Sequence, residues 1–460
     1  MKKLDLFIHS HQKQKVAVIG MGVSNTPLIA LLLDHDISTT VRDKNPDPEV
    51  QKKLEGRGAK FVTGEGYLEG LTEEVIFRTP GLSINHPALQ KARAEGKKIT
   101  SEMQEFFHFC PCPVIAVTGS DGKTTTTTLI AKFLEGTGKK VFLGGNIGQP
   151  LLCDIEEMKI EDIAVVELSS FQLMDLNCRP KVAVVTNLSP NHLDYHKDME
   201  EYVASKCHIF TEQDSGQKVI FNQDNEASLE IVSLAKGTKK FFSRFSADSD
   251  VYLKEEGIFL KSRTECVLPF SKIQLKGVHN IENYMAAILA VEDYCSTEQI
   301  QSVAEDFFGV PHRMQLIRSL DGVNYYNDSI GTSPTRTIAG LHSFDRRIIL
   351  IAGGYDKGIP FTEMGQEIKA YVKHLVLVGA TATAIQKAVE ESRDPKDLAL
   401  SGELQSVSVE TDLESAIVKA KSLSETGDDI VLSPACAAFD QFKNFVERGN
   451  FFEQVVKGFP

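Results

Sequence analysis

The sequence lacks any uninterrupted apolar run of the roughly 18 residues that a membrane span requires. Its opening residues, Met1-Lys2-Lys3-Leu4-Asp5, contain no apolar stretch like that of a signal peptide. Eight cysteines are scattered along the chain, and although Cys110 and Cys112 lie close together, no second pair completes a zinc site. We therefore expect no membrane span, a cytoplasmic location and reduced structural thiols.

An excess of basic charge is also missing, since the net charge is −13. This balance argues against non-specific nucleic-acid binding, but a local cradle of backbone amides can still bind phosphate on an acidic protein. Internal repeats and low-complexity segments are absent. A length of 460 residues with 42% hydrophobic and 25% charged residues indicates a globular protein of about three domains.

The most informative segment is 117–126, Val-Thr-Gly-Ser-Asp-Gly-Lys-Thr-Thr-Thr. It follows an apolar run, 114–117, that is typical of a buried strand. A helical pattern comes next, with one apolar face formed by Leu129, Ile130, Phe133 and Leu134. Loop amides and a helix N-terminus in this order form a phosphate cradle, in which Lys123 can reach the terminal phosphates and Thr124 can offer its hydroxyl to magnesium. Val117 stands where the standard pattern has glycine, so the alternative is an ordinary strand–helix turn.

The first hundred residues predict a second nucleotide site. A strand over 15–20 leads into Gly20-Met21-Gly22, a helix passes through Leu28, Leu31 and Leu32, and Asp43 ends the next strand where a ribose-binding acid would sit. Asn25 occupies the place of the third glycine in the dinucleotide fingerprint. Nucleotide binding and a structural turn both remain open for this segment.

Polar residues recur directly after predicted strands, where open α/β sheets bind ligands. Glu167 follows the strand 164–166 and could bind magnesium, and His192 follows the strand 182–186 and is a candidate metal ligand. A solvated acid and a structural histidine are the alternatives. Asp328, Lys357 and the segment 433–442 also follow predicted strands. Lys206 lies fourteen residues after His192, Asn280 opens a predicted helix, and Arg313 offers a guanidinium suited to bidentate phosphate contact.

The alternation of strands and helices predicts an α/β protein with parallel, helix-covered sheets. We expect a helix over 280–295, a capping box between Ser296 and Gln299, and strands over 348–352, 375–378 and 430–432. Boundaries at 110–113 and 309–313 divide the chain into three domains, 1–105, 106–310 and 311–460. The first and third would be Rossmann-like, and the second a P-loop ATPase-like domain.

Taken in order, these segments resemble the Mur ligases, the ATP-dependent amide-forming enzymes of peptidoglycan precursor synthesis. The resemblance spans nearly the whole chain. It is strongest at 144–148 (Gly-Gly-Asn-Ile-Gly), 167–173 (Glu-Leu-Ser-Ser-Phe-Gln-Leu), 433–437 (Ser-Pro-Ala-Cys-Ala) and 440–445 with Arg448-Gly449. These motifs are closest to the member that adds D-glutamate to UDP-N-acetylmuramoyl-L-alanine through an acyl phosphate, with release of ADP and phosphate.

The resemblance implies a UDP-sugar domain, an ATPase domain and a domain for the amino acid and part of the nucleotide. It implies ATP as a substrate, two magnesium ions, a monomer and no nucleic-acid partner. The implied ATP-binding residues are Gly119, Ser120, Asp121, Gly122, Lys123, Thr124, Thr125, Asn280, Arg313 and Asp328. Those for the UDP substrate are Gly22, Val23, Ser24, Asp43, Asn146 and His192, and those for D-glutamate are Thr332, Lys357 and Phe445. The implied metal ligands are Thr124, Glu167, His192 and Lys206 as its carbamate, and the catalytic set is Lys123, Glu167, His192 and Lys206.

Three positions depart from the family pattern. Ile330 replaces a common lysine, Asn191 replaces the aspartate before the histidine, and Ala438 replaces a serine often used toward the amino acid. The nearest alternative is therefore another Mur ligase or a folylpolyglutamate synthase-like ligase with a different substrate. A Rossmann oxidoreductase and an ATP-binding regulatory or scaffold protein are the alternatives outside this superfamily.

Overall fold

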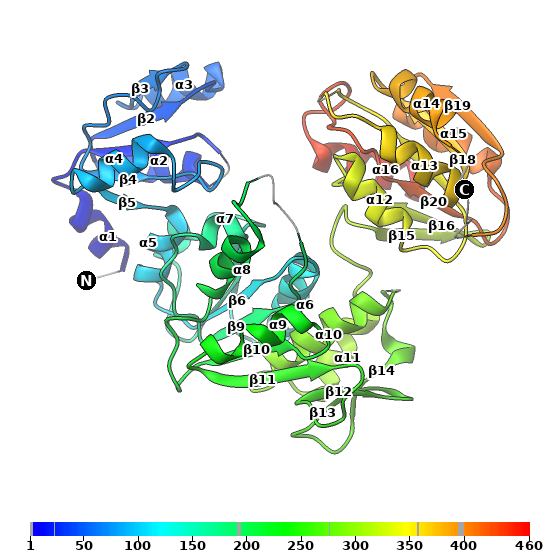
Figure 1. The fold of residues 1–460 in the computed structure, drawn as a ribbon, viewed down its shortest axis with the longest axis horizontal. Helices are drawn as coiled ribbons and strands as arrows, with labels where there is room; N and C mark the ends of the chain where they lie inside the picture. Colours follow the sequence, from blue (N-terminus) through cyan, green and yellow to red (C-terminus); the bar gives the residue numbers. More distant parts are fainter. Residues whose placement is uncertain (1–2, 23, 191–194, 276, 357, 394–399) are drawn as a thin grey trace. The chain divides into compact units, whose positions relative to one another are not determined.

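The computed structural model describes residues 3–22, 24–190, 195–275, 277–356, 358–393 and 400–460. The chain divides into two compact units, Met1–Asp306 and Phe307–Pro460, and the described residues form three separate sheets (Figure 1). None of the described helices is both long enough and apolar enough to cross a membrane. The predicted α/β class with three sheet-containing parts is confirmed.

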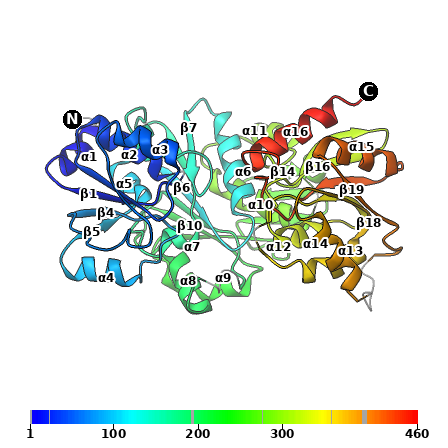
Figure 2. The ribbon, with the colours of Figure 1, turned by 90° about the horizontal axis from the view of Figure 1, so that it is seen from above.

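The N-terminal sheet of the first unit is entirely parallel, with strand order β3-β2-β1-β4-β5. Its strands are β1 (Val16–Ile19), β2 (Thr39–Asp43), β3 (Lys60–Thr63), β4 (Val75–Phe77) and β5 (Lys98–Thr100). The helices are α1 (Lys3–His11), α2 (Asn25–Asp34), α3 (Pro48–Glu55), α4 (Pro87–Ala94) and α5 (Glu102–Phe109). Because successive side chains of β1 point to opposite faces, Val16 and Val18 pack toward α2 while Ala17 and Ile19 pack toward α4 (Figure 2).

The second sheet of this unit has the order β14-β13-β12-β11-β10-β9-β6-β8-β7. Its parallel strands are β6 (Val114–Thr118), β7 (Val141–Gly145), β8 (Ile163–Glu167), β9 (Val182–Val185), β10 (Lys218–Asn222), β11 (Thr238–Ser243) and β12 (Val251–Lys254). Two antiparallel strands extend it, β13 (Gly257–Leu260) and β14 (Cys266–Pro269). Neither of these last two strands was predicted from the sequence.

The helices around this sheet are α6 (Lys123–Glu135), α7 (Ser170–Leu173), α8 (Met199–Cys207), α9 (Glu226–Glu230), α10 (Val278–Ala290) and α11 (Thr297–Asp306), with short 3₁₀ turns η1 (Leu152–Asp154), η2 (Val232–Leu234) and η3 (Phe270–Lys272). Helix α6 buries the predicted apolar face and packs against α10. The helix predicted over 280–295 ends at Ala290. The capping box before α11 is confirmed, since Ser296 N donates to Gln299 Oε1 at 2.8 Å and Gln299 N donates to Ser296 Oγ at 3.3 Å.

The second unit contains one six-stranded sheet of order β15-β16-β20-β17-β18-β19, parallel except for the β15–β16 pair. The strands are β15 (Gln315–Leu320), β16 (Val323–Asn327), β17 (Ile348–Ala352), β18 (Val372–Val378), β19 (Ser406–Glu410) and β20 (Asp429–Leu432). Helices α12 (Pro334–Leu341), α13 (Thr362–Tyr371) and α14 (Ala382–Glu391) cover one face, and α15 (Leu413–Leu423) and α16 (Phe445–Lys457) cover the other (Figure 2). The carboxyl ends of the parallel strands carry the polar segments that the sequence singled out.

Candidate active site

The loop between β6 and α6 requires glycine at two positions. Gly119 and Gly122 have φ values of +150° and +76°, which L-residues rarely adopt. A Cβ atom at Gly119 would lie 1.9 Å from Thr186 Oγ1, and one at Gly122 would lie 2.2 Å from Asn283 Oδ1. Val117 is buried within β6, so the departure from the standard motif falls in the strand, before the loop turns.

The loop is held in shape by the segment that follows β9. Ser120 N donates to Asn187 O at 2.9 Å, and Asp121 N donates to Asn187 Oδ1 at 2.9 Å. Ser189 N donates to Ser120 Oγ at 2.8 Å. The segment after β9 therefore fixes the loop after the neighbouring strand β6. These contacts limit the motion of the loop at the N-terminus of α6.

Lys123 begins α6 and folds back over the loop. Its Nζ donates to Gly119 O at 3.0 Å and to Ser120 O at 2.7 Å. Thr124 is buried in the first turn of the helix, and Thr125 follows it. Backbone amides at a helix N-terminus, a nearby ammonium group and a threonine hydroxyl together suit a chain of phosphates.

Glu167 ends β8, next to β6, and its side chain is buried at 1% exposure. Asn146 Nδ2 donates to Glu167 Oε1 at 2.7 Å, whereas Oε2 has no hydrogen-bond partner. A buried carboxylate oxygen without a partner is costly and suits a cation as its neighbour. Among the residues that the structure describes, no cluster of three or more His, Cys, Asp or Glu side chains is arranged to hold a metal.

Lys206, on α8, also reaches the loop and is 1% exposed. Its Nζ donates to Gly119 O at 2.7 Å and lies 4.8 Å from the centroid of the Tyr202 ring. Burial, together with repulsion from Lys123, lowers the Lys206 pKa well below its usual value. The amine is therefore more readily uncharged than that of an ordinary surface lysine.

Asn280 and Asn283 connect the start of α10 to the phosphate-loop helix. Asn283 Nδ2 donates to Asn280 Oδ1 at 3.1 Å, and Thr126 Oγ1 donates to Asn283 Oδ1 at 3.2 Å. Asn283 is buried, and its side-chain amide oxygen lies so close to Gly122 that a Cβ atom on residue 122 would clash with it. The predicted residue Asn280 is thus brought to the same region as the loop.

Three of the predicted UDP-binding residues, Gly22, Ser24 and Asp43, lie near the end of β1, whereas Asn146 follows β7 and bonds to Glu167. Met21 N donates to Asp43 Oδ2 at 2.7 Å, so the carboxylate at the end of β2 reaches the glycine-containing turn. Ser24 precedes α2 without a side-chain cap, and a Cβ added at Gly22 would meet no atom within 4 Å. Asn25 Nδ2 donates to Ile19 O at 2.9 Å and to Gly20 O at 3.2 Å, which ties the turn to the strand.

In the second unit, Asp328 follows β16 and is buried at 5% exposure. Ser433 Oγ donates to Asp328 Oδ2 at 2.7 Å, and Met314 N donates to Oδ1 at 3.3 Å. Burial raises the Asp328 pKa to about 6, although both hydrogen bonds oppose this change.

Neighbouring contacts bring the other predicted residues of this unit together. Ser329 Oγ donates to the carbonyl of Phe445 at 2.8 Å, and Ile330 N donates to His312 O, next to Arg313, at 3.1 Å. Thr332 N donates to Ile330 O at 2.8 Å. The predicted residues Val23, His192 and Lys357, and the departure at Asn191, lie outside the described residues.

Comparison with protein families gives three consecutive matches. Residues 14–101 match the MurD-like N-terminal domain of Mur ligases, residues 117–291 match the Mur ligase middle domain, and residues 312–436 match the Mur ligase glutamate ligase domain. A curated UDP-N-acetylmuramoylalanine–D-glutamate ligase from Acetivibrio thermocellus is 47% identical over 461 aligned residues, covering 99% of this chain and 98% of the relative. A ligase of the same name from Clostridium beijerinckii is 46% identical, covering 96% of each chain.

The chain belongs to the Mur ligase family. Solved structures agree at the level of the fold. UDP-N-acetylmuramate–alanine ligase MurC from Thermotoga maritima has a TM-score of 0.58 at 16% identity, covering 96% of this chain and 99% of its own. MurF from Acinetobacter baumannii has a TM-score of 0.55 at 18% identity, covering 96% of this chain and 90% of its own.

Several residues that shape this Mur ligase site were not assigned a role from the sequence. Asn187 and Ser189 fix the phosphate loop, and Tyr202 OH lies 2.9 Å from Ser120 Oγ. Arg448 is buried and binds two loops of the second unit. The position of Asn187 directly after a strand was the available signal, whereas nothing in the local sequence indicates the partners of Tyr202 or Arg448.

Proposed function

We propose that this Mur ligase joins D-glutamate to UDP-N-acetylmuramoyl-L-alanine, with conversion of ATP to ADP and phosphate, in the synthesis of peptidoglycan precursors. The observation that carries this proposal is the 44–47% identity, over nearly the whole chain, to curated relatives named for that reaction. The ATP-dependent ligase chemistry is common to the family, and the cradle at 119–124 supplies a matching phosphate site.

The proposed chemistry begins by activating a carboxylate, which is a poor acyl donor because its leaving group would be oxide. Transfer of the γ-phosphoryl group gives an acyl phosphate, and the amine of D-glutamate then attacks the acyl carbon. A tetrahedral intermediate forms and phosphate leaves. Lys123, whose Nζ already lies over the loop, would bind the phosphates and stabilise the charge that develops during the transfer.

Two sets of residues would hold magnesium ions. When bound, magnesium would neutralise the negative charge of the phosphates. The first is Thr124 with Glu167, and the unpartnered Glu167 Oε2 fits a cation there. The second is His192 with Lys206. An amine that lies 2.7 Å from a loop carbonyl cannot help to hold a cation, but its carbamate can. A lysine whose pKa is lowered by burial has the free amine that reacts with carbon dioxide.

The remaining roles follow the same division of the chain. The domain over 1–105 would bind the UDP group through Gly22, Val23, Ser24 and Asp43, with Asn146 and His192 from the domain over 106–310. The domain over 311–460 would bind ATP through Arg313 and Asp328, and D-glutamate through Thr332, Lys357 and Phe445. We propose that the enzyme acts as a monomer in the cytoplasm, where ATP is available.

The deciding experiment supplies the purified protein with ATP, magnesium and UDP-N-acetylmuramoyl-L-alanine, together with either D- or L-glutamate. We expect ADP release and a new amide only with D-glutamate. Other UDP-muramoyl precursors and other amino acids serve as controls, because related ligases share the ATPase chemistry and differ in substrate. Faster turnover with any of these alternatives would overturn the assignment.

A further inference from the structure

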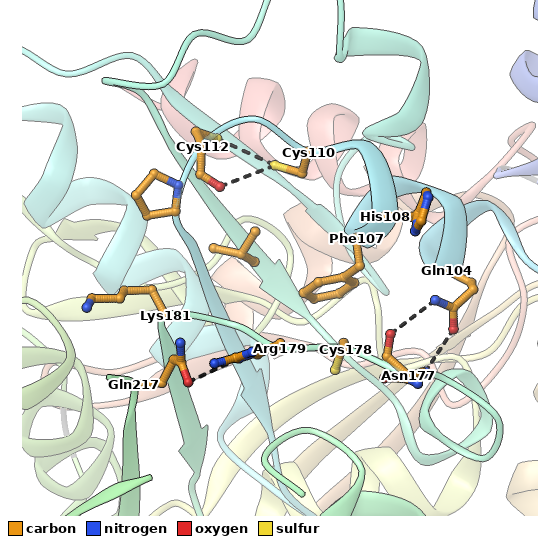
Figure 3. Close-up of a pocket in the computed structure, with 12 residues that line it drawn as sticks. Gln104, Phe107, His108, Cys110, Cys112, Asn177, Cys178, Arg179, Lys181 and Gln217 are labelled. Atoms are coloured by element: carbon orange, nitrogen blue, oxygen red, sulfur yellow. Dashed lines mark hydrogen bonds between the residues drawn. The ribbon is translucent and has the colours of Figure 1, made fainter. Parts of the chain in front are cut away.

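A cavity of about 510 Å³ lies in the first unit, away from the phosphate loop. It is bordered by the end of α5, the start of β6 and the segment 177–181. Figure 3 shows Cys110 and Cys112 together on one side of this cavity, with Arg179 and Gln217 on another. None of these residues takes part in the proposed ligase reaction, so the cavity has no role in the chemistry described above.

The two thiols are close enough to interact. Cys110 Sγ lies 3.6 Å from Cys112 Sγ and donates to Cys112 O at 3.5 Å. Cys110 is partly exposed, whereas Cys112 is buried. Cys178 lines the same cavity, but its thiol donates to His208 O at 3.6 Å. The cavity therefore contains a thiol pair and a third, separate thiol that serves as an internal comparison.

The surroundings of the three thiols shift their pKa values in different directions, and their reactivity differs as a result. Hydrogen bonds from Cys112, aided by the positive charge of Lys3, lower the Cys110 pKa. The Cys112 pKa is raised because its proton is shared with Cys110, and burial raises the Cys178 pKa. Since the thiolate is the nucleophile in disulfide exchange and Cys110 is the more exposed of the pair, Cys110 is suited to attack and Cys112 to resolve.

We propose that Cys110 and Cys112 form a reversible redox site that reacts with low-molecular-weight disulfides entering this cavity. The Cys110 thiolate attacks one sulfur of R–S–S–R, so that a Cys110–S–S–R bond forms and RS⁻ leaves. Cys112 then gives up its proton to the released thiolate and attacks the Cys110 sulfur, which expels the second RS⁻. This RS⁻ takes up the proton that Cys110 lost to the solvent when it became a thiolate. Overall, two protein thiols are oxidised to one disulfide and R–S–S–R is reduced to two R–SH.

Closing the disulfide requires a modest movement. The sulfur atoms must approach from 3.6 Å to about 2.05 Å. Cys110 directly follows α5 in an extended conformation, with φ −61° and ψ 123°, and only Pro111 separates the pair. Two residues span at most about 7 Å between Cα atoms, near the upper limit for a disulfide. The resulting small ring is strained, and strained disulfides are readily reduced, which makes the site reversible.

The test treats the full-length protein with oxidised glutathione, alkylates the remaining thiols and maps the peptides by mass spectrometry. In the wild-type protein we expect the peptide containing residues 110–112 to lose two hydrogens and to be restored by dithiothreitol. The Cys112→Ser variant should accumulate a glutathione adduct on Cys110, and the Cys110→Ser variant should form neither product. The matched control Cys178→Ser should behave like the wild type.

Alkylation of the unmodified wild type provides a second measurement that does not depend on the variants folding. With limiting iodoacetamide near neutral pH, Cys110 should be modified several-fold faster than Cys178. Equal rates for these two cysteines, or a 110–112 peptide that stays fully alkylated after treatment with oxidised glutathione, would overturn the proposal.

Discussion

The strand ends of the two units use buried polar groups in opposite ways. In the first unit, Glu167 leaves one buried oxygen without a partner, and the amine of Lys206 is buried against the Gly119 carbonyl at 2.7 Å and the Thr118 hydroxyl at 3.4 Å. In the second unit, both oxygens of Asp328 accept hydrogen bonds. Arg448 donates to Ser329 Oγ and to three carbonyls, those of Ser329, Cys436 and Ala437, at 2.9–3.1 Å.

This difference separates groups kept for ligands from groups that hold loops in place. An unpartnered buried carboxylate costs free energy in the protein alone, and the cost is recovered when a cation binds. An arginine that already makes four hydrogen bonds within the protein contributes to the framework. Substitution of Glu167 or Lys206 should therefore change activity, whereas substitution of Arg448 should change stability.

The largest effect is expected for Lys206→Ala. Loss of the carbamate would remove a proposed magnesium ligand, so turnover should fall by about 10³-fold or more. Short carboxylic acids or high bicarbonate should restore part of the activity, because a small anion can occupy the space that the side chain leaves. Lys218→Ala is the control, since Lys218 forms ion pairs with Glu292 and Asp293 instead. Full activity of Lys206→Ala would contradict the proposed role.

Glu167→Gln should be the next most harmful change. Glutamine can still accept a hydrogen bond from Asn146 but carries no charge for a cation, so we expect kcat to fall by about 10²–10³-fold with little change in melting temperature. Glu102→Gln is the matched control. Glu102 is equally buried, its pKa is raised to about 7 by burial, and it accepts from Leu152 N at 2.8 Å. Equal losses in both variants would show that burial, and not metal binding, explains Glu167.

Arg448→Met should reverse this pattern and act on stability. The substitution removes the Arg448 donor from the buried carbonyls of Ser329 and Cys436, whereas the Ala437 carbonyl still accepts from Tyr355 N, and each buried group without a partner costs about 1–3 kcal/mol. We expect the second unit to lose about 3 kcal/mol or more, measured by calorimetry. Arg346→Met is the control because the Arg346 side chain is 51% exposed. An unchanged melting temperature with abolished turnover would instead place Arg448 in the reaction.

Asp328 predicts a pH dependence of stability. Its folded pKa of about 6 exceeds the ordinary value of 3.8, so the fold favours the protonated form. This contribution is complete below about pH 4 and is lost as the pH rises through 6. A shift of about two units corresponds to at most about 3 kcal/mol. Calorimetry from pH 4 to 7 should show a smaller fall in stability for Asp328→Asn than for the wild type, and parallel curves would contradict the assignment.

The sequence predicted the elements whose signals are local. The apolar face of α6, the Ser296–Gln299 capping box and the strand 348–352 were correct because each depends on residues a few positions apart. The β12–β13 hairpin was missed, since Glu255 and Glu256 connect its strands in place of a typical Asn-Gly turn.

Partners far apart in the sequence could not be predicted. Asn146 and Glu167 are 21 residues apart, and Ser329 and Arg448 are 119 apart, so only the fold brings them together. Strand-end placement singled out Glu167 and Asp328 as candidate site residues. It did not reveal that both carboxylate oxygens of Asp328 accept hydrogen bonds, whereas one oxygen of Glu167 has no partner.

Asn25 gives the smallest expected effect and tests whether a departure from a motif can belong to the framework. Its amide donates to the carbonyls of Ile19 and Gly20, two bonds that a glycine at this position cannot make. Asn25→Gly restores the dinucleotide fingerprint but should destabilise the protein by about 1–2 kcal/mol in urea unfolding. Exposed Asn85→Gly provides the control. Unchanged stability in Asn25→Gly would mean that Asp43 and the glycines alone hold the turn. Asn25 would then belong, like Glu167, with the groups that are kept for a ligand.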